Sequence, residues 1–209
     1  MEIINAYLIK ALAILIVITV MGFSKAYTSY KLGDIAIKNM GKVSLNPKKH
    51  FEILGFIIFI FFGYGWTAPL DTSSLYYKNR KKGNILVNTI PFLVAIIFAF
   101  LSYFIAKILT LFNLGIALNI SIFFSILGAY FINFLVFNIF PIYPLFGQKL
   151  FQAILPSNKA IKLSQYEKML QIVVIFLLIS GILQKFLQYI SLFILTMISL
   201  PVNIIFGAI

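Results

Sequence analysis

The side chains that could do chemistry in this 209-residue chain are few. The chain has one histidine, His50, no cysteine, and five carboxylates spread along its length. A protein-bound zinc normally takes three or four ligands from His, Cys, Asp and Glu, and a catalytic zinc adds a water molecule. No pair of nucleophile and base is visible either. These residues predict no metal, no cofactor and no catalytic group, so we do not expect the protein to be an enzyme.

Two stretches of the chain nevertheless carry a recognisable pattern. Residues 21–34 read M-G-F-S-K-A-Y-T-S-Y-K-L-G-D, and residues 138–147 read N-I-F-P-I-Y-P-L-F-G. Together they resemble the two metal-binding segments of the site-2 protease family, the zinc metalloproteases that cut inside membranes. In that family the first segment reads H-E-x-x-H-A-Y-x-A-Y-K-L-G-D and the second reads N-x-x-P-x-x-P-L-D-G.

The chain departs from the family pattern at the positions that carry the chemistry. Met21 and Lys25 stand at the two histidine positions, Gly22 at the glutamate position and Phe146 at the aspartate position. A thioether is a poor zinc ligand, an ammonium repels the metal, and Gly and Phe offer neither a base nor a ligand. The resemblance therefore implies a site-2 protease fold that has lost its metal and its activity. We interpret these four residues and Tyr143 as a vestigial site that contacts a partner.

Further parts of the family pattern follow in the same order along residues 10–180. Residues 41–50 (G-K-V-S-L-N-P-K-K-H) are similar to G-R-L-T-L-N-P-x-K-H. Residues 65–69 (G-W-T-A-P) are similar to G-W-A-K-P, where the family forms a β-hairpin near its active site. Residues 88–94 keep the Pro of A-G-P-x-x-N but neither its Gly nor its Asn. Turn chemistry alone accounts for single matches but not for their shared order.

The resemblance implies that the function is binding. The family fold receives a transmembrane helix of another protein and unwinds it by strand pairing near the zinc, and an inactive member could still hold such a helix. We therefore predict a pseudoprotease that binds or scaffolds another integral membrane protein. The alternatives are a structural accessory subunit of a larger membrane complex and, behind it, a transporter or channel. Transporters usually place ionisable groups at mid-membrane, whereas the expected spans offer neutral ones such as Asn133 and Asn138.

Lys25 has two interpretations. In the first, its stem lies along apolar surface while the ammonium reaches the membrane interface. In the second, the ammonium replaces the positive charge of the zinc and needs a buried partner such as a carboxylate. Asp34 and Glu52 are the nearest carboxylates along the chain. For Tyr143 and Phe146, the alternative to a functional role is packing in the core.

Composition places the chain in a membrane. It is 62% hydrophobic and 11% charged, with a mean hydropathy of +1.04, whereas soluble domains are about 45–50% apolar and about 25% charged. The net charge of +12 would suggest nucleic acid as a partner of a soluble protein. In a membrane protein, Lys and Arg instead mark cytoplasmic loops and meet anionic lipid headgroups. We expect lipid and membrane-protein partners, no nucleic acid, and a bacterial inner (cytoplasmic) membrane.

The apolar runs predict an all-α membrane protein of about five to six hydrophobic helices in one domain, residues 1–209. The expected spans are 3–22, 85–109, 116–138 and 169–184. Residues 51–66 are too short to cross the bilayer and contain three glycines, so we interpret them as re-entrant. A small hairpin or loop follows near residues 66–78. Residues 189–209 form a last apolar segment that either spans the membrane or lies at its surface.

The lysines predict which loops share a side of the membrane. The loops 24–50, 67–84 and 141–168 are all basic, and basic loops face the cytoplasm. Two successive basic loops share a side only if the segment between them does not cross, which agrees with a re-entrant 51–66.

Overall fold

The computed structural model describes residues 2–112 and 114–207. All regular secondary structure among these residues is helical, and there is no strand. The helices are α1 (Glu2–Lys31), α2 (Ile35–Asn39), η1 (Pro47–Lys49), α3 (Ile53–Phe62), η2 (Ser74–Tyr76), α4 (Arg80–Thr110), α5 (Gly115–Asn138), α6 (Phe146–Ile154), α7 (Ser157–Gln165), α8 (Glu167–Ile179) and α9 (Ile182–Gly207). The expectation of an all-α protein is confirmed.

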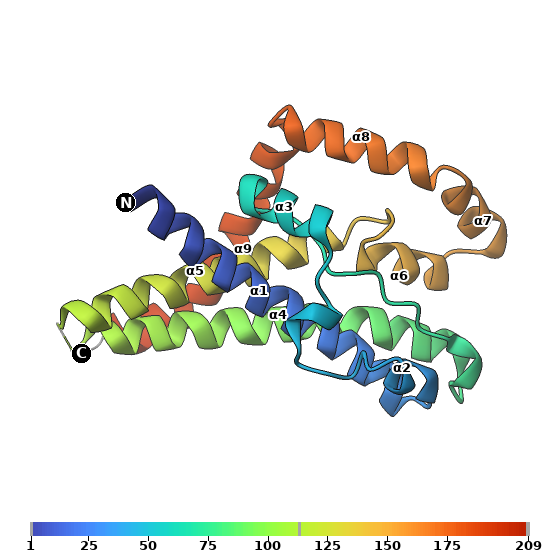
Figure 1. Ribbon diagram of the computed structural model, residues 1–209, viewed down its shortest axis with the longest axis horizontal. Helices are drawn as coiled ribbons and strands as arrows, with labels where there is room; N and C mark the ends of the chain where they lie inside the picture. Colours follow the sequence, from blue (N-terminus) through green and yellow to red (C-terminus); the bar gives the residue numbers. More distant parts are fainter. Residues whose placement is uncertain (1, 113, 208–209) are drawn as a thin grey trace.

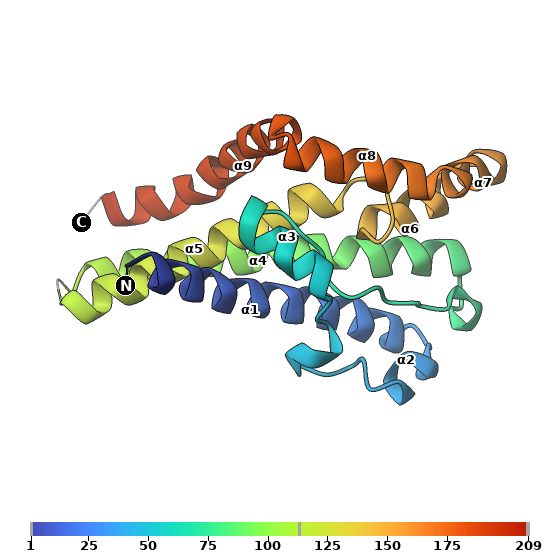
Figure 2. The ribbon, with the colours of Figure 1, turned by 45° about the horizontal axis from the view of Figure 1, so that its top comes forward.

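Four helices are long and apolar enough to cross a membrane: Ile4–Lys31 of α1, α4, α5 and α9. The antiparallel pair of α4 and α5 forms the centre, with α1 on one side and α9 on the other (Figures 1 and 2). Small residues allow the central pair to approach closely, as is usual between membrane helices. A Cβ added at Gly128 of α5 would lie only 3.2 Å from the Ala99 carbonyl oxygen of α4 and 3.0 Å from the Tyr103 ring.

Polar side chains cap the first turns of four helices. The side chains of Asp34, Asn46, Glu52 and Asn79 accept hydrogen bonds from backbone N–H groups at the start of α2, η1, α3 and α4, which satisfies donors that a helix start leaves free. Gly63, with φ of +77°, ends α3 in the left-handed region that favours glycine. The loop at 66–78 contains η2 and otherwise extended or irregular chain.

Two expected segments differ from the observed helices. The structure divides the run 169–184, because α8 ends at Ile179 and Gly181 has a φ of +77° before α9 begins. The fourth long apolar helix is thus α9, which covers most of the segment 189–209; residues 208–209 of that segment, like Asn113, lie outside the described residues. Helix α3, at ten residues, is about 15 Å long. That length is too short to cross, although the membrane topology itself stays a prediction.

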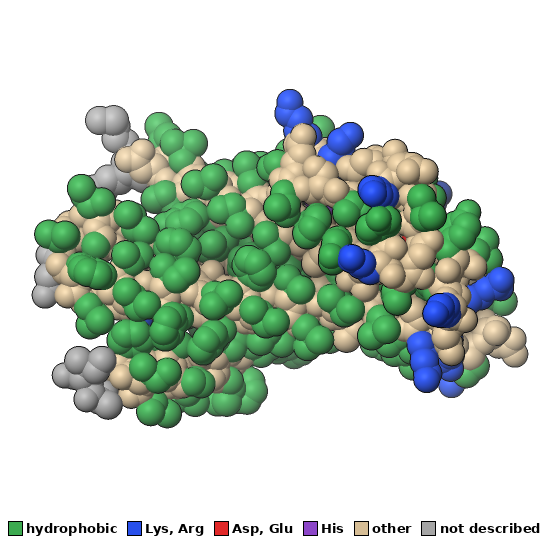
Figure 3. All heavy atoms as spheres, turned by 90° about the horizontal axis from the view of Figure 1, so that it is seen from below, with side chains coloured by type: hydrophobic (Ala, Val, Ile, Leu, Met, Phe, Trp, Pro, Cys, Tyr) green, Lys and Arg blue, Asp and Glu red, His purple; other side chains and the backbone are tan. Residues whose placement is uncertain are grey.

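Charge and apolar surface are separated along the long axis of the molecule. Hydrophobic side chains cover most of the face in Figure 3, and Lys and Arg gather toward one end. This is the end at which Figure 1 places α2, the start of α4 and α7. Helix α4 begins there with Arg80-Lys81-Lys82. Such a distribution predicts that the basic end faces the cytoplasm.

Single cysteines at the basic end should report one side of the membrane. The chain has no cysteine of its own, so labelling of Lys42→Cys and Lys81→Cys with a membrane-impermeant maleimide is specific. We expect both to react from the cytoplasmic side. Leu111→Cys, at an exposed residue beyond the opposite end of α4, should react only from the other side. Opposite labelling of residues 42 and 81 would mean that the α3 segment crosses the membrane.

Candidate functional site

The structure brings together the positions that the family pattern singles out. Met21, Gly22 and Lys25 are buried on α1, and Phe146, the first residue of α6, lies against Lys25. The Lys25 Nζ atom is 4.2 Å from the centre of the Phe146 ring. Residues four apart share one face of a helix, so Met21 and Lys25 point toward the same region. Tyr143 differs from this group because its side chain is 38% exposed.

The Lys25 ammonium meets an aromatic cluster instead of a carboxylate. The Phe146 ring packs against Phe134 at 5.5 Å and against Phe92 at 6.4 Å between ring centres. A cation over a ring face is attracted by the ring quadrupole, by about 2 kcal/mol or more when water is excluded. With Lys25 only 3% exposed, its ammonium does not reach an aqueous interface as the first interpretation expected.

The two carboxylates considered as partners of Lys25 are used elsewhere. Asp34 accepts hydrogen bonds from the Ser29 hydroxyl and the Ser73 backbone N–H, each at 2.9 Å. Glu52 accepts a hydrogen bond of 2.6 Å from the Gly55 N–H at the start of α3. Both therefore hold backbone in place. Within the described residues, no salt bridge involves Lys25.

His50 occupies the space that a side chain at position 22 would need. A Cβ built on Gly22 would lie 2.6 Å from Cγ of His50 and 2.9 Å from its Cβ. The imidazole is fully buried, its Nε2 is 2.7 Å from the Ser44 carbonyl oxygen, and its Nδ1 has no hydrogen-bond partner among the residues that the structure describes. Sequence reasoning left His50 in a loop. The only sequence feature that could have indicated the packing of His50 against Gly22 is that the chain's one histidine occurs together with a glycine at the glutamate position.

Asn138 fixes an irregular segment beside this site. Its Nδ2 donates hydrogen bonds to the Gly65 carbonyl at 2.8 Å and to the Phe134 carbonyl at 2.9 Å, while its buried Oδ1 has no partner among the described residues. Residues 64–67 have no regular secondary structure and are buried. They lie on α3 so closely that a Cβ added at Gly55 would approach the Trp66 carbonyl oxygen to 2.7 Å. The asparagine of the second family segment thus positions the G-W-T-A-P segment.

The donor set at these positions does not fit a zinc ion. It consists of a thioether, a glycine, an ammonium and a phenyl ring from Met21, Gly22, Lys25 and Phe146. The free Nδ1 of His50 beside Gly22 would be a single ligand, whereas a zinc site takes three or four from the protein. Across residues 2–112 and 114–207, no group of three or more His, Cys, Asp and Glu side chains could hold a metal.

Comparison with known proteins finds one protease-related similarity. No family model and no solved structure matches the chain. Over 160 residues the chain is 26% identical to the protein named "Putative zinc metalloprotease YwhC" of Bacillus subtilis (strain 168), and the alignment covers 75% of this chain and 73% of that protein. The chain is thus similar in sequence to a protein named as a zinc metalloprotease, and it has four helices that are long and apolar enough to cross a membrane. The similarity supports the resemblance to this family but not a loss of activity.

The expectation that the chain is not an enzyme is contradicted by this similarity. The relative carries the name of a zinc metalloprotease, which points to protease activity. Our expectation was derived from the side chains at four positions and from the small number of His and acidic residues. It gave no weight to the rest of the chain, and the similarity extends over three quarters of the sequence.

Filling the space between Gly22 and His50 should destabilise the protein. Gly22→Ala places a methyl group against a buried imidazole that Ser44 holds in position, and overpacking of this kind typically costs about 1–3 kcal/mol. In a chain of this size each kcal/mol lowers the melting temperature by about 2–4 °C. Gly115→Ala is the matched control, since its Cβ would meet nothing within 4 Å. Equal melting temperatures for the two variants in detergent would contradict the close packing.

His50 should make stability depend on pH. Burial lowers the pKa of His50 from its ordinary value of 6.5, against the opposing effect of the Ser44 carbonyl, while nearby Lys42 lowers it further. The folded protein therefore binds the proton less readily than the unfolded chain. The contribution of neutral His50 to the free energy of unfolding is fully present above pH 6.5 and is lost as the pH falls below it. We expect His50→Asn to flatten the dependence of melting temperature on pH in this window. An unchanged slope in that variant would assign it to other groups.

Proposed function

We propose that this site-2 protease-like protein binds a membrane segment of another integral membrane protein along residues 64–67. The observation that carries this proposal is the buried backbone without regular secondary structure that Asn138 holds between α3 and the end of α5. The family resemblance implies that a substrate segment pairs with this region as a strand. The protein's place is the bacterial cytoplasmic membrane, with the basic end of the molecule on the cytoplasmic side.

The backbone of this segment has free hydrogen-bonding groups. Within the described residues, the N–H groups of Gly65, Trp66 and Thr67 donate no hydrogen bond. In apolar surroundings a free backbone group is costly, so nearly all of them find a partner. An extended peptide pairs with such an edge through its own backbone, and this mode of recognition depends little on sequence. The segment is therefore suited to a polypeptide that has lost its helical hydrogen bonds.

Helix α8 covers this segment and controls access to it in our proposal. Val174 and Ile175 of α8 line a small apolar cavity together with Trp66 and Tyr143. The Gln148 side chain donates a hydrogen bond of 2.7 Å to Glu167 at the start of α8. At its other end, α8 is followed by the break at Gly181. Movement of α8 about these two ends would uncover the backbone of residues 64–67.

Crosslinking from the rim of this region tests the proposal. Tyr143→Cys in the otherwise cysteine-free chain is coupled to a benzophenone maleimide, and a biotinylated, leucine-rich transmembrane peptide of about 20 residues is added in mild detergent. We expect saturable crosslinking from residue 143 that unlabelled peptide competes away. The control is Ile204→Cys, at a position of α9 that is 71% exposed and faces lipid in this orientation.

The same experiment separates binding from cleavage. Mass spectrometry of the peptide, with and without added zinc, measures any cut in its backbone. Equal crosslinking yields from residues 143 and 204, unaffected by the competing peptide, would show that no specific binding region lies under α8 and would contradict the proposal.

A further inference from the structure

A basic cavity opens between the end of α1 and the start of α4, and it involves none of the residues of the vestigial site. Its volume is about 380 Å³, within the range of about 300–1,000 Å³ that is usual for small-molecule sites. Three of the side chains that line it are lysines, and none of its lining residues is acidic. The lining residues are Lys31, Leu32, Tyr77, Lys78, Asn79, Lys82, Gly83 and Leu86.

The wall of this basic cavity is held in place by contacts within the chain. The Tyr77 ring packs on α4 so closely that a Cβ added at Gly83 would lie 2.5 Å from it. The Tyr77 hydroxyl is 2.7 Å from the Ser29 hydroxyl of α1. The Asn79 side chain accepts a hydrogen bond of 3.0 Å from the Lys82 N–H. These contacts join α1, the loop before α4 and the first turn of α4 around the cavity.

The three lysines of the cavity carry charge that the protein itself does not compensate. Within the described residues, Lys31, Lys78 and Lys82 form no salt bridge, and all three side chains are exposed. Asp34, which accepts a hydrogen bond from the same Ser29 hydroxyl, is buried and does not line the cavity. Like charges repel one another, and an anion placed among them removes this repulsion. The positive end of the α4 helix dipole acts in the same direction.

The lengths of the two helices place the basic cavity at the level of the lipid headgroups. Helices α1 and α4 have 30 and 31 residues, so each is about 45 Å long. A bilayer including its headgroup layers is about 40–45 Å thick. The end of α1 and the start of α4 lie at the same end of the molecule (Figures 1 and 2). In the predicted orientation, the cavity therefore lies in the cytoplasmic headgroup layer.

An apolar row on α4 continues from the basic cavity toward the membrane interior. Leu86, which lines the cavity, is six residues beyond Arg80 and thus about 9 Å deeper along the helix. A headgroup layer is about 5–8 Å thick, so the hydrocarbon begins near this depth. Leu86, Leu93 and Ile97 share one face of α4 and are 45%, 54% and 55% exposed. A molecule with an anionic head and an acyl chain fits both parts.

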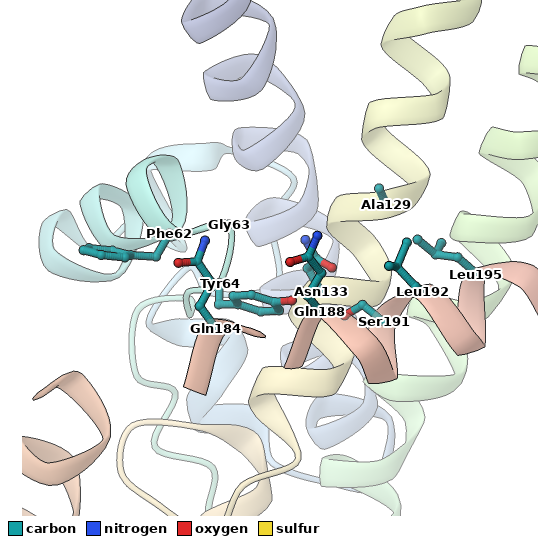
Figure 4. Close-up of a pocket in the computed structure, with 10 residues that line it drawn as sticks. All are labelled: Phe62, Gly63, Tyr64, Ala129, Asn133, Gln184, Gln188, Ser191, Leu192 and Leu195. Atoms are coloured by element: carbon teal, nitrogen blue, oxygen red, sulfur yellow. The ribbon is translucent and has the colours of Figure 1, made fainter. Parts of the chain in front are cut away.

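The cavity between α3, α5 and α9 lacks the charge that distinguishes the basic one. Figure 4 shows its side chains, which include Tyr64, Asn133, Gln188 and Ser191, and no charged residue lines it. The Tyr64 hydroxyl forms a hydrogen bond with Ser191. An anion would find no opposite charge there, whereas three ammonium groups surround the basic cavity.

We propose that the basic cavity binds the phosphate group of an anionic phospholipid such as phosphatidylglycerol. Each ammonium offers three hydrogen-bond donors, and charge-assisted bonds to phosphate oxygens are strong. Basic pockets between membrane helices on the cytoplasmic side suit anionic headgroups. A zwitterionic lipid would bring a cation of its own toward the lysines. The lipid links α1 to α4, and this role does not depend on the binding of another protein's membrane segment.

Lipid binding to the full chain in mild detergent tests the proposal. Native mass spectrometry measures the affinity for phosphatidylglycerol and for phosphatidylcholine. We expect the wild-type protein to prefer phosphatidylglycerol by at least about tenfold. The variant that combines Lys31→Gln, Lys78→Gln and Lys82→Gln should lose this preference. Equal affinities of the wild-type protein for the two lipids would overturn the proposal.

A matched variant separates a specific site from the overall positive charge. Lys38→Gln, Lys48→Gln and Lys168→Gln together remove the same charge at exposed positions that do not line the basic cavity. This control variant should keep the preference for phosphatidylglycerol. Equal losses in the two triple variants, or full retention in the variant of the cavity lysines, would overturn the proposal.

Melting temperatures in detergent provide a second measurement. Exposed Lys→Gln changes have little effect on stability, so both triple variants should melt near the wild-type temperature without lipid. Phosphatidylglycerol should raise the melting temperature of the wild-type protein and of the control variant, because a ligand stabilises the state that binds it. It should not raise that of the variant of the cavity lysines. An equal rise in all three proteins would contradict the site.

Two further measurements distinguish a lipid from free phosphate. Inorganic phosphate in large excess should not displace phosphatidylglycerol, because it lacks the acyl chains that lie along α4. Leu86→Gln should weaken the binding of phosphatidylglycerol severalfold, since it places a polar group where the hydrocarbon begins. Displacement by inorganic phosphate, or an unchanged affinity in Leu86→Gln, would overturn the assignment of a lipid.

Discussion

The contact between the Lys25 ammonium and the Phe146 ring joins the parts of this protein that the family pattern singles out. A charge inside a membrane protein is expensive unless a partner compensates it, and here the partner is an aromatic ring supported by Phe92 and Phe134. Lys25 of α1 thus contacts the Phe146 ring of α6, and that ring packs in turn against Phe92 of α4 and Phe134 of α5.

Other polar groups in the interior fall into two classes according to their partners. Asp34, Glu52 and the Asn138 amide nitrogen fix the backbone at helix starts and at residue 65. Among the described residues, the buried His50 Nδ1, Asn88 Oδ1 and Asn138 Oδ1 atoms have no hydrogen-bond partner. Each such group, buried away from water, raises the free energy of the folded protein.

Similarity and site chemistry describe different features of the chain. The alignment with a protein named as a zinc metalloprotease covers most of the sequence and points to protease activity, whereas the side chains at the zinc-binding positions do not form a zinc site. A fold can carry more than one chemistry, so function has to be argued from the site.

The sequence by itself determined the all-helical class and the presence of apolar helices that are long enough to cross a membrane. Long apolar runs and ordered motif matches are local properties of the sequence, so they can be recognised without knowledge of the tertiary contacts. The partner of Lys25 and the position of His50 against Gly22 depend on contacts between distant segments, which no local pattern encodes. The break at Gly181 illustrates the limit. Hydropathy alone cannot show that a continuous apolar run contains a residue in the left-handed region, and only the tertiary structure separates α8, which covers the site, from α9, which crosses beside α5.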